Sequence, residues 1–121
     1  VLVIADNPAV IEMYTRMLQD TDMYELSSAP TPEAAAAMAE SINPDVIVLD
    51  ILMPGQNGWS LLRSLRGKRA TRDIPVLVCS VFDEPELAMS LGATEFLRKP
   101  VSTEQLVRAL ESCLLARSNR A

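Results

Sequence analysis

The chain has 121 residues, of which 49% are hydrophobic, and this size and composition suit one compact domain with a single core. Eleven basic and sixteen acidic residues give a net charge of -5, which argues against nucleic acid or an anionic membrane as a direct partner. No apolar stretch approaches the roughly 20 residues of a membrane-spanning helix, so we expect a cytoplasmic domain.

Short apolar runs rich in β-branched residues alternate with helical patterns along the whole chain. The third run is the most apolar and β-prone, which places it at the centre of a sheet. In chain order, the predicted strands cover about 1–5, 24–28, 45–50, 74–79 and 94–97. The predicted helices follow these strands and begin at Pro8, at Pro32, just after the 54–58 loop, at Pro85 and at Ser102.

Local signals mark several helix ends. Asn7-Pro8 and Thr31-Pro32 each place a capping residue before a proline, and proline suits the first helical position. The fourth helix, about 85–91, is followed by Gly92, a residue type that favours a left-handed C-cap. The last helix opens with a capping box at residues 102–105.

Five strands alternating with five helices predict an α/β fold with a parallel sheet and right-handed crossovers. We expect a single domain over residues 1–121, with 117–121 as a frayed tail or the start of a linker. Because the chain starts at Val1 without a methionine, we expect it to be either a trimmed chain or a piece excised from a longer protein. Cys79 and Cys113 are far apart and have no metal-ligand spacing, so we expect buried, reduced thiols.

Polar side chains stand at the ends of four predicted strands, namely Asp6, Asp50, Ser80 and Lys99. Ligands of open parallel sheets gather at this carboxyl edge. Two neighbouring carboxylates repel each other unless a cation joins them, and oxygen ligands suit Mg²⁺. A lysine can hold an anionic carboxylate or a phosphoryl oxygen, to which a serine hydroxyl can also donate. This group of residues could therefore stabilise phosphoryl transfer to a carboxylate.

Each of these residues has a plainer interpretation. Asp6 could be a helix cap, Ser80 a loop hydroxyl and Lys99 a solvated charge. Their coincidence at one edge of the sheet favours a functional site over three independent explanations.

The motifs at this edge resemble those of bacterial response-regulator receiver domains, over residues 1 to about 115. The residues that carry the resemblance are the segment 44–54 around Asp50, Gly58, Gly92-Ala93, Phe96 and Lys99-Pro100. The resemblance implies a flavodoxin-like, doubly wound sheet of strand order 2-1-3-4-5. It also implies a cis peptide bond between Lys99 and Pro100.

The resemblance further implies roles for single residues. Asp50 would accept a phosphoryl group from a histidine kinase or phosphotransfer protein, and Mg²⁺ would be held by Asp6, Asp50 and the backbone carbonyl of Leu52. Ser80 would be the switch hydroxyl, and Lys99 would contact the phosphoryl group. The signal would leave through the fourth helix, fifth strand and last helix, toward a homodimer or an attached output domain.

The sequence departs from the family pattern around Asp50. Ala5 stands where receivers usually carry a second acidic residue, so we expect weaker binding of Mg²⁺. Val81 replaces the common Ala or Gly, and Phe82 and Leu52 add apolar bulk. We therefore predict slow hydrolysis of phosphorylated Asp50, with a lifetime of more than about a minute for the isolated domain.

Two further departures concern the switch. Phe96 takes the position of the family's rotating aromatic residue, although it could also be a core side chain that never moves. Gly92 follows Ser80 by twelve positions, about three fewer than in many receivers, which shortens the fourth helix or its preceding loop by nearly one turn.

Two other functions compete with a phosphorylation switch. A pseudo-receiver would keep the fold as an interaction module, with Ala5 and Val81 as marks of lost chemistry. A flavin or nucleotide binder is weakly supported, because the four glycines form no phosphate-binding loop. The chain has no histidine, which excludes catalytic triads and histidine-ligated metals. As an enzyme it would act at most on its own phosphorylation and dephosphorylation.

Overall fold

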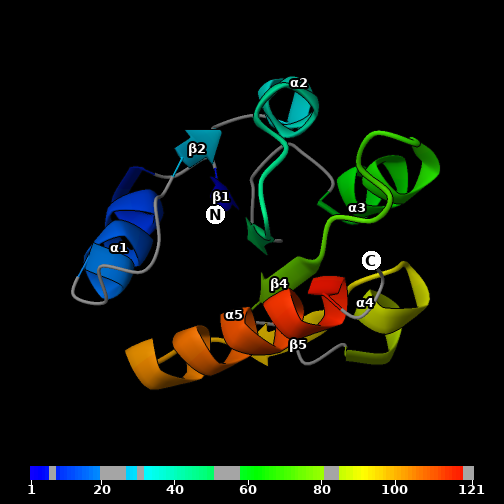
Figure 1. Ribbon diagram of the computed structural model, residues 1–121. Coiled ribbons are helices and arrows are strands. Elements are labelled where there is room, and N and C mark those ends of the chain that lie inside the picture. Colours follow the sequence, from blue (N-terminus) through cyan, green and yellow to red (C-terminus); the bar gives the residue numbers. More distant parts are fainter. Residues whose placement is uncertain (6–7, 20–26, 30–31, 51–57, 81–84, 119–121) are drawn as a thin grey trace.

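The computed structural model describes residues 1–5, 8–19, 27–29, 32–50, 58–80 and 85–118 (Figure 1). Within these ranges, five parallel strands form one sheet in the order β2-β1-β3-β4-β5. This arrangement confirms the predicted fold class and strand order. The strands are β1 (Leu2–Ile4), β2 (Ser27–Ala29), β3 (Ile47–Asp50), β4 (Val76–Ser80) and β5 (Glu95–Arg98).

Five helices in the described part of the chain cover the two faces of this sheet. They are α1 (Pro8–Gln19), α2 (Pro32–Ile42), α3 (Gly58–Gly67), α4 (Pro85–Ser90) and α5 (Thr103–Ser118). Helices α1 and α5 pack on one face, whereas α2, α3 and α4 pack on the other (Figure 1). Because both faces are covered, the strands are continuous apolar runs, as expected for a buried parallel sheet.

Successive side chains of each strand enter two separate hydrophobic clusters, since they point to opposite faces of the sheet. Ile47 and Leu49 pack with α2, α3 and α4, while Val48 packs with α1 and α5. In the alanine-rich helix α2, Ala35 and Ala39 are buried against the sheet. These alanines let the α2 backbone approach the strands closely.

Where the structure describes both residues, the strand boundaries differ from the sequence-based ones by at most two residues. Strand β4 begins at Val76 rather than Ile74, because the Ile74 N–H donates to the Thr71 carbonyl at 3.1 Å and Pro75 has no N–H. Strand β2 ends one residue later than predicted, at Ala29. Residues 24–26, the first part of that prediction, lie outside the described residues.

The last helix begins as the sequence indicates. Ser102 Oγ accepts a hydrogen bond from the Gln105 N–H at 3.1 Å, and Gln105 Oε1 accepts one from the Ser102 N–H at 2.9 Å. This reciprocal pair is the predicted capping box. The helix continues through Ser118, and residues 119–121 lie outside the described part of the chain. In that described part, no helix is long and apolar enough to span a membrane.

Candidate functional site

Asp50 is the last residue of β3, which lies between β1 and β4 in the middle of the sheet. Lys99 directly follows β5, on the other side of β4. Its ammonium Nζ lies 2.6 Å from Oδ2 of Asp50, and both side chains are largely buried, with 17% of Lys99 and 4% of Asp50 exposed. The peptide bond between Lys99 and Pro100 is cis, as predicted.

The short contact of Lys99 with Asp50 stabilises both buried charges. A carboxylate removed from water is costly unless it is paired and hydrogen-bonded, and a charge-assisted hydrogen bond meets that need. The backbone also holds the lysine in place, because the Lys99 N–H donates to the Ser80 carbonyl at 2.7 Å. The end of β4 and the residue after β5 are thus joined directly at the site.

Ser80 ends β4, and its side chain is fully buried. Strand alternation places Ser80 and Asp50 on opposite faces of the sheet, since Asp50 is in register with Cys79. Phe96 is in register with Val78, and therefore its side chain lies on the same face as that of Ser80. The Phe96 ring is partly buried and packs against the hydrophobic cluster under α2, α3 and α4. The structure therefore brings Asp50 and Lys99 together, and places Ser80 and Phe96 on one face of neighbouring strands.

Asp6 and Leu52, the other expected metal ligands, lie outside the described residues, as do Val81 and Phe82. Ala5 is described and is 1% exposed. Among the described residues there is no cluster of three His, Cys, Asp or Glu side chains that could hold a metal ion.

Sequence reasoning did not single out Tyr14, which lies under the site on α1. Tyr14 is completely buried in the same hydrophobic cluster as Cys79, the register partner of Asp50. Its hydroxyl has no nitrogen or oxygen partner within the described part of the chain, and the thiol of Cys79, a weak hydrogen-bonding group, lies beside it. Burial raises the pKa of Tyr14 above its ordinary value of 10.0, and the charge of the Cys79 thiol, the side-chain hydrogen bond with that thiol and the charge of Asp50 add to this effect.

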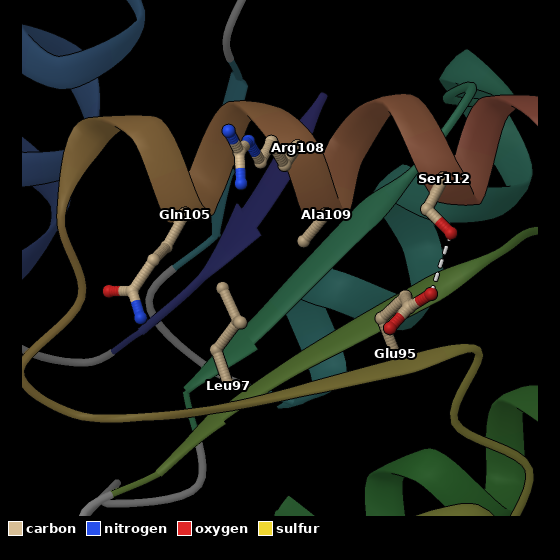
Figure 2. A pocket seen from close by; sticks show the side chains of 6 residues that line it. All are labelled: Glu95, Leu97, Gln105, Arg108, Ala109 and Ser112. Atoms are coloured by element: carbon tan, nitrogen blue, oxygen red, sulfur yellow. Dashed lines mark hydrogen bonds between the residues drawn. The ribbon is translucent and has the colours of Figure 1, made fainter.

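A pocket of about 280 Å³ lies between β5 and α5 (Figure 2). Leu97 and Ala109 contribute apolar surface, and Ser112 closes one end by donating to Glu95 Oε1 at 2.6 Å. None of the predicted phosphoryl-site residues lines this pocket. It belongs to the surface of β5 and α5 from which the sequence predicts that the signal leaves.

Comparison with known proteins assigns the family. Residues 1–111 match the response regulator receiver domain. Protein PilH of Pseudomonas aeruginosa is 30% identical over 94% of this chain and 96% of its own length. Response regulator PleD of Caulobacter vibrioides is 33% identical over 93% of this chain, but the chain spans only 25% of PleD.

A solved structure agrees with this assignment. The chemotaxis protein CheY4 of Vibrio cholerae superposes with a TM-score of 0.84 at 29% identity, covering 93% of this chain and 96% of CheY4. The chain therefore belongs to the receiver domains of response regulators, the signalling domains of two-component systems.

Proposed function

We propose that this domain is a phosphorylation-switched receiver that accepts a phosphoryl group on Asp50 from a histidine kinase or a phosphotransfer protein in the cytoplasm. The observation that carries the proposal is the contact between Lys99 and Asp50 at the carboxyl edge of the sheet. A cation already within 2.6 Å of the carboxylate is placed to counter the negative charge that a phosphoryl group brings.

In the proposed reaction, a carboxylate oxygen of Asp50 attacks the phosphorus of a phosphohistidine. The P–N bond breaks, its electron pair returns to the imidazole nitrogen of the donor, and an acyl phosphate forms on Asp50. Lys99 counters charge on the transferred oxygens throughout this exchange. Any catalysis by the domain is confined to forming and hydrolysing its own acyl phosphate.

The described part of the site fits a bound Mg²⁺ in one respect: Asp50 supplies a carboxylate, a hard oxygen ligand of the kind this cation prefers. The remaining ligands would be Asp6 and the backbone carbonyl of Leu52. When bound, Mg²⁺ neutralises charge shared by the carboxylate and the phosphoryl oxygens. Ala5 offers no ligand, which supports weaker binding than two acidic neighbours would give.

The proposed switch lies on the other face of the sheet. Ser80 would donate its hydroxyl to a phosphoryl oxygen, and the space behind it would accept the ring of Phe96. The change would then reach the surface formed by α4, β5 and α5. The recipient would be a second copy of the domain or an attached output domain, in keeping with the greater length of relatives such as PleD.

The alternative function is that of a pseudo-receiver, a constitutive interaction module. The observation that favours this alternative is the buried Ala5, which stands at the expected second acidic position. Beryllofluoride with Mg²⁺ mimics the acyl phosphate and separates the two functions. A phosphorylation switch predicts NMR chemical-shift changes that spread from Asp50 to Phe96. A spectrum that beryllofluoride leaves unchanged would favour the pseudo-receiver.

A further inference from the structure

Helix α4 is held to the rest of the domain by few side chains. It has six residues, and Ala88 is its one buried side chain. Leu87 and Met89 are large and apolar, yet 40% and 52% of their surfaces are exposed. A helix this short gains little from its own hydrogen bonds, so its position depends on what holds its ends.

The C-terminal end of α4 is closed by a cap that we define as residues 91–93. The Gly92 N–H donates to the Met89 carbonyl at 3.1 Å, and the Ala93 N–H donates to the Ala88 carbonyl at 3.0 Å. These are the two hydrogen bonds of a Schellman motif, which needs a left-handed residue at its centre. Gly92 supplies it, with φ of 105°.

Arg66, near the end of α3, links this cap by hydrogen bonds to the segment before β4. Its Nε donates to the Gly92 carbonyl at 2.7 Å. Its Nη1 donates to the carbonyls of Arg72 at 2.8 Å and Ile74 at 2.6 Å, in the segment that leads into β4. One planar guanidinium therefore joins the end of α3, the start of β4 and the cap of α4.

The fit between Arg66 and Gly92 leaves no room for a side chain at Gly92. A Cβ added at Gly92 would lie 2.6 Å from Cγ of Arg66 and 3.0 Å from its Nε. Two independent features therefore require a glycine at position 92: its left-handed backbone conformation and the close approach of Arg66. Arg66 therefore contacts Gly92 by close packing as well as by a hydrogen bond.

We propose that Arg66 is a positioning residue that anchors the C-terminal end of α4, so that Gly92 is the pivot about which α4 moves. The N-terminal end of α4, at Pro85, follows Ser80 by five positions and is the end closer in sequence to the proposed switch. A displacement that begins at Ser80 would swing α4 about its anchored end. The backbone of strand β5, which begins just after the cap, would keep its position while the ring of Phe96 turns.

This inference rests on the proposed function for the cause of the movement, but the anchor itself is a property of the unphosphorylated domain. It is tested by native-state amide hydrogen exchange of wild type and Arg66→Gln without any phosphoryl mimic. Losing a charge-assisted hydrogen bond should accelerate exchange of the Leu91, Gly92 and Ala93 amides by about ten- to a hundredfold. Amides of β3 serve as the internal reference for global unfolding.

Two further variants sharpen the test. Arg63→Gln removes an exposed arginine from the same helix, and cap exchange should stay at the wild-type rate. Arg66→Lys keeps the charge but lacks the planar set of donors, so it should give an intermediate rate. Equal acceleration of the cap and of β3 in Arg66→Gln, or no acceleration at all, would overturn the anchor.

Chemical-shift changes along α4 test whether the helix moves about Gly92. With beryllofluoride and Mg²⁺, wild type should show chemical-shift changes that decline along α4 from Pro85 toward Gly92, whereas Arg66→Gln should show them across the cap. The same profile in both proteins would overturn the pivot. If the signals around Asp50 fail to respond in wild type, the phosphorylation switch is wrong, and hydrogen exchange still decides whether Arg66 is an anchor.

Discussion

The Lys99 ammonium lies 2.6 Å from Oδ2 of Asp50, although 49 positions separate the two residues in the sequence. The pair reaches across the end of β4, because β3 and β5 are the two neighbours of that strand. Two strand ends far apart in the chain thus form one charged site. Substitution of either Lys99 or Asp50 tests the contact.

Replacing Lys99 with Met should lower the free energy of unfolding by about 3 kcal/mol, because it leaves the buried Asp50 carboxylate without its cation. In an Asp50→Asn background, the same replacement should cost much less. Urea unfolding of the four proteins in EDTA measures the coupling. Equal costs in the two backgrounds would mean that the ion pair contributes nothing to stability.

Ala5→Asp should raise the affinity for Mg²⁺ by about tenfold, because it restores a carboxylate near the proposed metal site. Ala5 is 1% exposed and follows Ile4, which is in register with Leu49, so the new side chain would lie beside Asp50. In EDTA the same variant should be less stable than wild type, owing to repulsion between the two carboxylates. Ala5→Asn supplies a control of similar size without the charge. Equal Mg²⁺ affinities of Ala5→Asp and wild type would contradict the expected role of this position.

Tyr14→Phe should stabilise the domain by about 1 kcal/mol, because it removes a buried hydroxyl that has only the weakly hydrogen-bonding thiol of Cys79 beside it among the described residues. The phenyl ring keeps the packing against Cys79 and the rest of the cluster. Thermal and urea unfolding measure the change, with Tyr14→Leu as a control that opens a cavity. A clear loss of stability in Tyr14→Phe would show that the hydroxyl is satisfied in solution.

The two thiols should contribute to a fall in the stability of the domain at alkaline pH. Burial raises the pKa of Cys79 from 9.0 to about 11 and that of Cys113 from 9.0 to about 12. Above pH 9 the unfolded chain loses these protons while the native domain keeps them. Their contribution is therefore complete below pH 9 and declines as the pH rises toward 11 and 12.

A Cys79→Val/Cys113→Val variant isolates this effect. Between pH 9 and 11, its free energy of unfolding should fall less steeply than that of wild type, by about 1.4 kcal/mol per pH unit for each thiol. Chemical unfolding at a series of pH values gives both slopes. Parallel slopes would show that neither thiol has a raised pKa in the native domain.

The position of Asp50 could be predicted because an apolar, β-prone run ends at it, and Lys99 because it follows another strand. The carboxyl ends of parallel strands meet at one edge, so a strand pattern alone brings such residues together. Both thiols are buried and free, as their apolar surroundings indicated. The positions of these residues follow from the pattern of apolar residues along strands and helices, which can be read from a single sequence.

The contacts of Arg66 could not be predicted in the same way. They join residues 26 positions apart through the side chain of a helix end and a turn carbonyl, and they depend on how α3 packs beside α4. The start of β4 was misplaced for a related reason, because a turn hydrogen bond from Ile74 overrides its β-propensity. Packing and turn geometry, rather than residue pattern, decide both features.

The central claim is that Asp50 is the phosphoacceptor, and intact-protein mass spectrometry tests it most directly. After incubation with acetyl phosphate and Mg²⁺, wild type should gain the mass of one phosphoryl group, and mild alkali should remove it as expected of an acyl phosphate. Asp50→Asn should gain nothing under the same conditions. A wild-type domain that stays unmodified, or an Asp50→Asn protein that is modified equally well, would contradict the assignment.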